Sequence, residues 1–157
     1  MTSLSDSRFP QPTGGRFDGP VHRFAVRVYF EDTDLTGVVY HANYLRFMER
    51  ARSDMLRAAG IDQRAALEGG EGFYAVADLA IRYRRPAKLD DALLVVSTVR
   101  EIRAASCVIH QRVMRGGEVV TEAAVTAAFL SSDGRPRRQP RGWIDIFERL
   151  KGNSDRS

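Results

Sequence analysis

The chain contains one long run in which apolar residues recur at helical spacing, and this run limits the folds available to it. The apolar positions follow one another at steps of three and four: Tyr44, Phe47, Met48, Ala51, Met55 and Leu56. Polar residues fill the intervening positions, so the spacing predicts one amphipathic helix with a single buried face. Asn43 is the expected N-cap, and Gly60 suits the left-handed position beyond the C-terminus.

Strand-like sequence lies on both sides of this helix. Alternating apolar residues predict a first strand at 21–30. Four β-rich runs follow the helix, over 73–84, 92–103, 106–115 and 118–131. Gly116-Gly117 is typical of a hairpin between the last two runs. One helix followed by four successive strands predicts an α+β fold, in which an antiparallel sheet packs one face against the helix.

The remaining segments mark the limits of one domain. Residues 1–20 are rich in Ser, Pro and Gly and lack the apolar core of a signal peptide, so we expect a flexible leader. A single domain is expected over 21–151. It includes a short helical turn at 64–67 and a C-terminal helix around 143–150, which covers a sheet edge or packs on a neighbouring subunit. Residues 152–157 are expected to fray.

Composition argues against several classes of protein. Lys and Arg number 24 against 20 acidic residues, and the chain has no aromatic–basic interleaving, so we expect no nucleic-acid partner. No run reaches the roughly 18 apolar residues that span a bilayer. The single Cys107 cannot form an internal disulfide, which fits a reducing compartment, and we expect a cytoplasmic protein. His22 and His110 lack ligand spacing to other donors, so no metal site is expected.

Two carboxylates and a histidine directly precede the helix. Asp32 and Asp34 lie in a turn containing Thr and Gly, and His41 stands just before the helix start. Backbone N–H groups at a helix start can stabilise a carbonyl oxygen as negative charge builds on it. A carboxylate beside them can attack an activated acyl group or activate water, without a metal. Asp34 could instead form only an Asx turn, and we expect Asp32 to orient the turn or a main-chain N–H.

The segment EDTDLTGVVYHANYLRFMERAR resembles the acyl-CoA thioesterases of the hot-dog superfamily, in the 4-hydroxybenzoyl-CoA thioesterase-like branch, and is similar to the Tol-Pal-associated members. The segment IRYRRPAKLDDALLV resembles the family's Tyr-x-x-Pro-Ala segment, and the whole resemblance covers about 24–138. It implies a curved antiparallel β-sheet wrapped around one long central helix. It also implies subunits that join their sheets into a homodimer or homotetramer, with active sites at the interface.

The resemblance also implies a substrate and its contacts. The substrate is an acyl-CoA thioester, with acyl carrier protein as an alternative carrier, and coenzyme A enters only as part of the substrate, without a separate cofactor. By position, Asp34 matches the catalytic carboxylate, as nucleophile or general base. His41 matches the residue at the helix start whose backbone amide faces the thioester oxygen. Leu35 and Thr36 stand where close relatives commonly have small residues, which leaves the acyl preference open.

Other candidates surround these two residues. Tyr44 is a candidate for lining the acyl pocket, and Glu49 for steadying the site from the helix. The candidates for binding the nucleotide phosphates of coenzyme A are Arg84, Arg85, Lys88, Arg135, Arg137 and Arg138. A dehydratase would require a different His/acid pair and a Pro-Gly-rich signature that this chain lacks. A non-catalytic hot-dog protein that binds acyl carrier protein or envelope-linked partners is the alternative to an enzyme.

Overall fold

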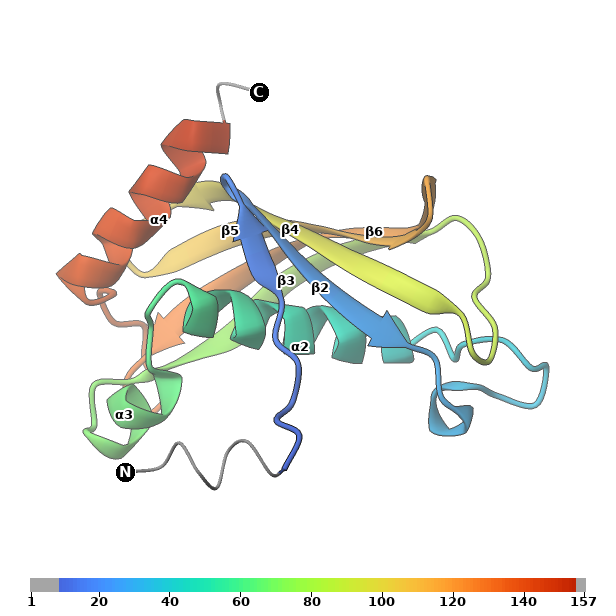
Figure 1. The fold of residues 1–157 in the computed structure, drawn as a ribbon. Helices are drawn as coiled ribbons and strands as arrows, with labels where there is room; N and C mark the ends of the chain where they lie inside the picture. The colour runs from blue at the N-terminus through green and yellow to red at the C-terminus, as the bar shows by residue number, and fades with distance from the viewer. Residues whose placement is uncertain (1–8, 155–157) are drawn as a thin grey trace.

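A curved antiparallel sheet forms the body of the protein, and one long helix lies against its concave face (Figure 1). The computed structural model describes residues 9–154. The strands are β1 (Arg16–Asp18), β2 (Val21–Arg27), β3 (Phe73–Tyr83), β4 (Ala92–Ile102), β5 (Ser106–Arg115) and β6 (Glu118–Leu130). Their order in the sheet is β1-β2-β4-β5-β6-β3, so β3 forms one edge. The predicted α+β arrangement is confirmed, as is the hairpin between β5 and β6.

The long helix α2 (Asn43–Ala58) buries the stripe that the sequence predicts. Its buried apolar side chains are Tyr44, Phe47, Met48, Ala51, Met55 and Leu56. The first four of them pack with inward-facing sheet residues such as Val95, Val113 and Val125, all fully buried. Gly60 has φ +89° just after the helix, as expected for a left-handed C-terminal position. This packing holds the N-terminal end of α2 in a fixed place relative to the sheet.

The predicted N-cap is wrong. Ala42 occupies the N-cap position, and Asn43 is the first helical residue. The side chain of Asn43 is turned inward instead, where it donates a hydrogen bond to the Asp32 carboxylate at 2.7 Å. Because the Asn43 side chain is hydrogen-bonded to Asp32, it does not cap the helix.

Strand β1 lies inside the segment expected to be a flexible leader. Arg16–Asp18 pairs antiparallel with β2. The N–H of Gly15 donates to the Asp54 carboxylate on α2 at 2.8 Å. A Cβ added at Gly15 would lie 2.3 Å from the Arg23 carbonyl oxygen, so the chain can approach β2 this closely only with glycine. Residues from Gly15 onward are thus joined to the folded domain.

Two further helices close the end of the fold opposite the start of α2. The short helix α3 (Gln63–Glu68) contains the predicted helical turn at 64–67. The predicted C-terminal helix is α4 (Arg141–Ser154), whose fully buried Phe147 packs with Met55 and Leu56 of α2. Figure 1 shows α4 crossing one end of the sheet. It reaches into the segment expected to fray, of which residues 155–157 lie outside the described part of the chain. Among the described residues, no helix combines the length and apolar character needed to cross a membrane.

Candidate active site

The connection between β2 and α2 is a loop that projects beyond the N-terminal end of the helix (Figure 1). It begins with a single 3-10 turn, η1 (Phe30–Asp32). The following turn is closed by two backbone hydrogen bonds of 3.0 Å, from the N–H of Asp34 to the Val38 carbonyl and from the N–H of Gly37 to the Asp34 carbonyl. Gly37 has φ +83°, which favours glycine at this position. The turn presents the Asp34 side chain to solvent.

The Asp34 carboxylate is held by Thr36 through one oxygen. Oδ1 accepts hydrogen bonds from the Thr36 hydroxyl at 2.5 Å and from the Thr36 N–H at 2.8 Å. These bonds, the hydroxyl bond above all, lower the pKa of Asp34, and the nearby His41 contributes in the same direction. In the described part of the chain Oδ2 accepts no hydrogen bond. Asp34 therefore forms an Asx turn and also keeps an ionised oxygen free to react.

Asp32 has a structural role. It is buried, and its carboxylate accepts hydrogen bonds from the N–H of Tyr29 at 2.8 Å and from the Asn43 side chain at 2.7 Å. Its own carbonyl accepts a hydrogen bond from the N–H of Tyr40 at 2.9 Å. The expectation that Asp32 orients the turn and a main-chain N–H is confirmed.

His41 stands at the helix start with an exposed side chain. Its ring lies 4.5 Å from the Tyr40 ring and 6.2 Å from the Tyr83 ring, measured between centroids. The N–H of Asn43 donates to the Tyr40 carbonyl at 2.8 Å. By contrast, the N–H groups of His41 and Ala42 donate no hydrogen bond to any described residue. Two unpaired donors therefore lie at the positive end of α2, where an oxygen with developing negative charge is stabilised.

The Tyr-x-x-Pro-Ala segment packs directly on this helix start. The Tyr83 hydroxyl donates to the His41 carbonyl at 2.9 Å. The N–H of Ala87 donates to the Tyr44 hydroxyl at 3.1 Å, and the Ala87 carbonyl accepts from the N–H of Val39 at 2.8 Å. The two sequence segments that resemble one family are thus parts of one site.

Tyr44 is almost fully buried, with 3% of its surface exposed. Burial raises the pKa of its phenol, which stays protonated at neutral pH. Its described contacts are with Ala87 and with the rings of Phe47 and Tyr83. Tyr44 fixes the loop after β3 against the helix, and direct contact between Tyr44 and a substrate stays a prediction.

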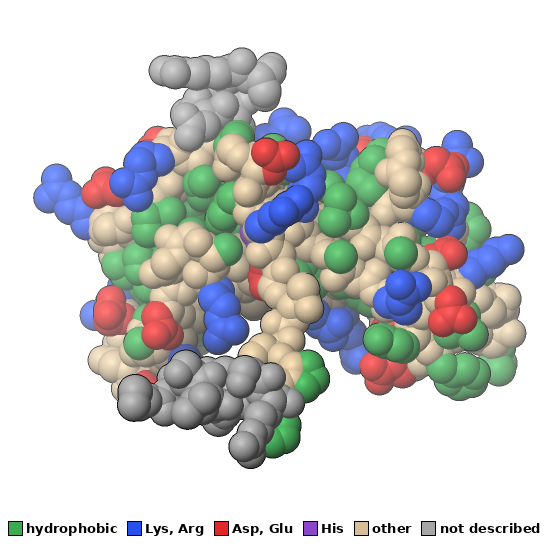
Figure 2. Space-filling model, in the orientation of Figure 1, with side chains coloured by type: hydrophobic (Ala, Val, Ile, Leu, Met, Phe, Trp, Pro, Cys, Tyr) green, Lys and Arg blue, Asp and Glu red, His purple; other side chains and the backbone are tan. Residues whose placement is uncertain are grey.

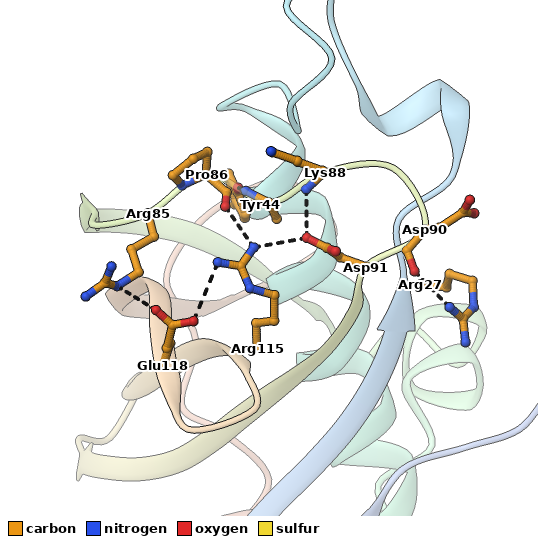
Figure 3. Close-up of polar contacts among 10 residues, drawn as sticks. Arg27, Tyr44, Arg85, Pro86, Lys88, Asp90, Asp91, Arg115 and Glu118 are labelled. Carbon is orange, nitrogen blue, oxygen red and sulfur yellow. Dashed lines mark hydrogen bonds and ion pairs between the residues drawn. The ribbon is translucent and has the colours of Figure 1, made fainter.

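The basic candidates fall into two groups at opposite ends of β3. Arg84 and Arg85 follow the strand and form ion pairs with Glu122 at 2.7 Å and Glu118 at 3.1 Å. Lys88 continues this group (Figure 3). Its exposed ammonium forms no hydrogen bond or ion pair with a described residue, but its charge contributes to lowering the pKa of Asp91. A backbone bridge between Lys88 and Val38 places this residue beside the Asp34 turn.

The second group lies before the start of β3. Arg137 donates to the carbonyls of Gly70 and Glu71, at 3.0 and 2.6 Å. Arg135 lies 3.7 Å from Asp133, and Arg138 is exposed without a described partner. Figure 2 shows basic side chains interspersed with acidic ones on the face that it displays. Within one chain, the second group and the Asp34 turn lie at opposite ends of α2.

Sequence reasoning missed Arg115, which supports the loop after β3 (Figure 3). One nitrogen of its guanidinium donates to the Pro86 carbonyl at 2.9 Å and to the Asp91 carboxylate at 3.0 Å. The N–H of Lys88 donates to the same carboxylate at 2.9 Å. Because Arg115 lies 24 residues beyond Asp91, no local pattern could have indicated this contact. Thr36 was also missed, although its position two residues after Asp34 is typical of an Asx turn.

The other titratable candidates have structural contacts. His22 is fully buried, and its Nε2 lies 2.8 Å from the Asp54 carboxylate. Burial lowers the pKa of His22. Glu49 forms an ion pair with Arg52 one helical turn further along α2. No group of three His, Cys, Asp or Glu residues that could hold a metal ion is found in the part of the chain that the structure describes.

A cavity of about 370 Å³ opens at the other end of α2, between α3, the start of β3 and α4. Its volume lies within the range of about 300–1,000 Å³ that is typical of small-molecule pockets. Tyr74, Phe129 and Trp143 form an aromatic group in its wall, with ring centroids 5.2 to 5.9 Å apart. Leu67 of α3 lines it as well. The cavity is large enough for a small acyl group, but within one chain it lies far from Asp34.

A curved antiparallel sheet around one long helix, with an exposed carboxylate in the turn before that helix, defines a hot-dog domain of the thioesterase type. Residues 28–147 match the family model of the thioesterase-like superfamily. The chain belongs to this superfamily.

Individual relatives agree with this assignment. The chain is 47% identical over 129 residues to the acyl-CoA thioesterase YbgC of Haemophilus influenzae, covering 82% of this chain and 95% of the relative. It is 37% identical to the acyl-CoA thioester hydrolase YbgC of Escherichia coli O157:H7, over 80% of this chain and 95% of the relative. A solved probable thioesterase from Bartonella henselae superimposes with a TM-score of 0.73 at 36% identity, over 76% of this chain and 99% of that one.

A more distant solved structure supports the fold alone. The DHNA-CoA thioesterase from Staphylococcus aureus superimposes with a TM-score of 0.81 at 20% identity, over 87% of this chain and 94% of that one. The curved sheet around a central helix is therefore shared well beyond the range of recognisable sequence similarity.

Proposed function

We propose that this protein hydrolyses acyl-CoA thioesters to a free carboxylic acid and coenzyme A. One observation supports the proposal above all: the same loop carries a carboxylate oxygen of Asp34 without a hydrogen bond and, at the helix start, the N–H groups of His41 and Ala42 without an acceptor. Relatives named acyl-CoA thioesterase and acyl-CoA thioester hydrolase, at 47% and 37% identity, support the choice of substrate. No metal or separate cofactor takes part in this scheme.

The reaction needs one nucleophile and one site for negative charge. Either Asp34 Oδ2 attacks the thioester carbonyl carbon, or it takes a proton from a water molecule that attacks. The carbonyl oxygen gains charge and is stabilised by the amides at the helix start. Collapse of this intermediate breaks the C–S bond, and the coenzyme A thiolate leaves and takes up a proton. In the first route a water molecule then hydrolyses the acyl-aspartyl anhydride, which releases the free acid and restores the Asp34 carboxylate.

Basic residues near the site are proposed to bind the phosphates of coenzyme A. Lys88 lies beside the Asp34 turn and forms no ion pair with a described residue, so its ammonium can pair with a phosphate of the ligand. Arg84 and Arg85 already face acidic side chains, which reduces the charge that they offer. Acyl carrier protein, which presents the same phosphopantetheine arm, is the alternative carrier. The cytoplasm is the expected place for either substrate.

The functional unit is proposed to be a homodimer, with a homotetramer as the alternative. Strand β3 is an open edge of 11 residues, and Val76, Leu79 and Tyr83 on it are exposed. Leu35 in the Asp34 turn is fully exposed as well. Antiparallel pairing of two β3 edges about a two-fold axis would satisfy their free N–H and C=O groups and cover these apolar side chains.

The same pairing would complete the site. Because the two strands run in opposite directions, the start of β3 in one subunit lies near the end of β3 in its partner. The aromatic cavity and Arg138 of one subunit then approach Tyr83 and Asp34 of the other. We propose that the acyl group enters this cavity and that the arginine binds a phosphate of coenzyme A.

A thiol-release assay over a panel of acyl-CoAs, from short aliphatic to aromatic, tests the proposed function. Steady release of coenzyme A from at least one thioester, with one equivalent of free acid, is the expected result. An absence of release from every thioester, together with binding of acyl carrier protein, would favour the non-catalytic alternative.

A further inference from the structure

Tyr83 contacts the backbone at the start of α2, although the proposed hydrolysis assigns it no role. Its hydroxyl donates to the carbonyl oxygen of His41 at 2.9 Å, from the last residue of β3 to the residue before the helix cap. Its ring packs on the rings of His41 and Tyr44. Partial desolvation raises the pKa of the half-exposed Tyr83 phenol above its ordinary value, so the phenol is protonated at neutral pH and acts as a donor. The contact therefore fixes the backbone at the helix start.

The carbonyl of His41 and the N–H of Ala42 belong to the same peptide unit. The described chain contains no cis peptide bond, and in a trans unit the C=O and N–H point in opposite directions. Holding the carbonyl against Tyr83 therefore directs the N–H of Ala42 away from the phenol. A hydrogen bond to a carbonyl also polarises its own amide, which strengthens the N–H as a donor. This N–H donates to no described residue.

We infer that Tyr83 is a positioning residue of the thioesterase site. It orients and polarises the His41–Ala42 peptide so that the N–H of Ala42, beside that of His41, donates to the thioester oxygen. The inference rests on the proposed function. It assigns to the tyrosine of the Tyr-x-x-Pro-Ala segment a role in the stabilisation of charge during the reaction.

The chain offers a matched control in Tyr40. This tyrosine also packs on the His41 ring, at 4.5 Å, but its hydroxyl forms no hydrogen bond with a described residue. Tyr83→Phe and Tyr40→Phe each remove one hydroxyl and keep one ring beside the same histidine. Only Tyr83→Phe removes the hydrogen bond to the peptide.

Two measurements on these variants test the inference. Steady-state kinetics should show kcat reduced roughly tenfold in Tyr83→Phe with KM changed less than about twofold, because a donor that strengthens in the transition state is weakened. The amide ¹⁵N resonance of Ala42 in the free protein should move upfield in Tyr83→Phe, since loss of a hydrogen bond at the preceding carbonyl shields this nitrogen. Tyr40→Phe should change neither quantity.

The outcomes distinguish a failure of the role assigned to Tyr83 from a failure of the proposed hydrolysis. Wild-type kcat in a folded Tyr83→Phe protein would overturn the assignment of Tyr83 and leave the proposed function intact. A reduced kcat with an unchanged Ala42 resonance would contradict the inference that Tyr83 acts by orienting and polarising the His41–Ala42 peptide. If the unaltered protein releases no thiol from any acyl-CoA, the proposed function fails, and the assignment of Tyr83 fails with it.

Discussion

The side-chain amide of Asn43 donates a hydrogen bond to the buried Asp32 carboxylate, with 2.7 Å between Nδ2 and Oδ1. This bond joins the first residue of α2 to the turn that follows β2. It therefore sets the position of the Asp34 turn relative to the helix start.

Replacing Asn43 by alanine should destabilise the fold. Asn43→Ala leaves a buried carboxylate short of one donor, and a hydrogen bond to a charged group contributes about 1.5–3 kcal/mol. Urea denaturation should show a loss of this size in the free energy of unfolding. Thr33→Val is the control, because it removes an exposed hydroxyl bond to the Phe30 carbonyl, and it should cost less than about 1 kcal/mol. Equal losses for the two variants would contradict the role given to Asn43.

The pH dependence of hydrolysis should respond to Thr36. Its hydroxyl bond stabilises the ionised form of Asp34 and so lowers the pKa of that carboxyl. Hydrolysis fails as pH drops through this pKa, because the protonated carboxyl neither attacks nor accepts a proton. In Thr36→Val the pKa rises toward its ordinary value, so the acidic limb of kcat/KM should move to higher pH. Thr33→Val should leave the limb in place, and a limb unmoved by Thr36→Val would show that another group titrates.

Binding of coenzyme A should depend on the cations that form no ion pair within the described chain. Lys88→Gln and Arg138→Gln should each raise KM for acyl-CoA roughly twofold to fivefold, as for exposed ion pairs, with little change in kcat. The wild-type KM should rise with salt more steeply than that of either variant. Arg84→Gln is the comparison, since Glu122 already faces this arginine, and it should change KM less. A larger rise in KM for Arg84→Gln than for Lys88→Gln and Arg138→Gln would contradict the proposal that the cations without an ion pair bind coenzyme A.

Mixed dimers test whether the cavity of one subunit serves the carboxylate of the other. Leu67→Trp should narrow the cavity and reduce hydrolysis most for the bulkiest acyl groups. In a dimer of one Leu67→Trp and one Asp34→Asn subunit, one site keeps an intact carboxylate and an intact cavity. Such a dimer should recover roughly half of the wild-type rate with bulky substrates, whereas neither variant alone does so. Failure to recover activity would place the cavity and the carboxylate in the same subunit's site.

Local patterns predicted most of the fold. The helical stripe from Tyr44 to Leu56 and the glycine pair before β6 each depend on neighbours within a few residues, and both predictions are confirmed. Three paired residues in β1 are too few to produce a periodic signal, so that strand was missed. Asn43 was predicted to be the N-cap because it directly precedes the apolar stripe. Its hydrogen bond with Asp32 forms across 11 residues in the folded turn, so the local pattern did not indicate it.

The site likewise contains residues that local patterns predict and residues that they do not. The Asp34 turn and the helix start are adjacent in sequence and could be predicted together. The contacts of Tyr83 with His41 and of Arg115 with Pro86 span 42 and 29 residues, and they depend on the order of strands in the sheet. No local pattern carries such contacts, so the supporting residues emerged only from the fold.

If the Asp34 carboxylate attacks the thioester or activates water, Asp34→Asn should remove most of the acyl-CoA hydrolysis. Asp32→Asn serves as the control, because its role is structural, and the variant should retain much more activity. The measurement is thiol release from the best acyl-CoA substrate by wild type and both variants, each shown to be folded by circular dichroism. We expect kcat to be at least roughly 10²-fold lower in Asp34→Asn than in the wild type. Near-wild-type release by the folded Asp34→Asn protein would contradict this role of the carboxylate.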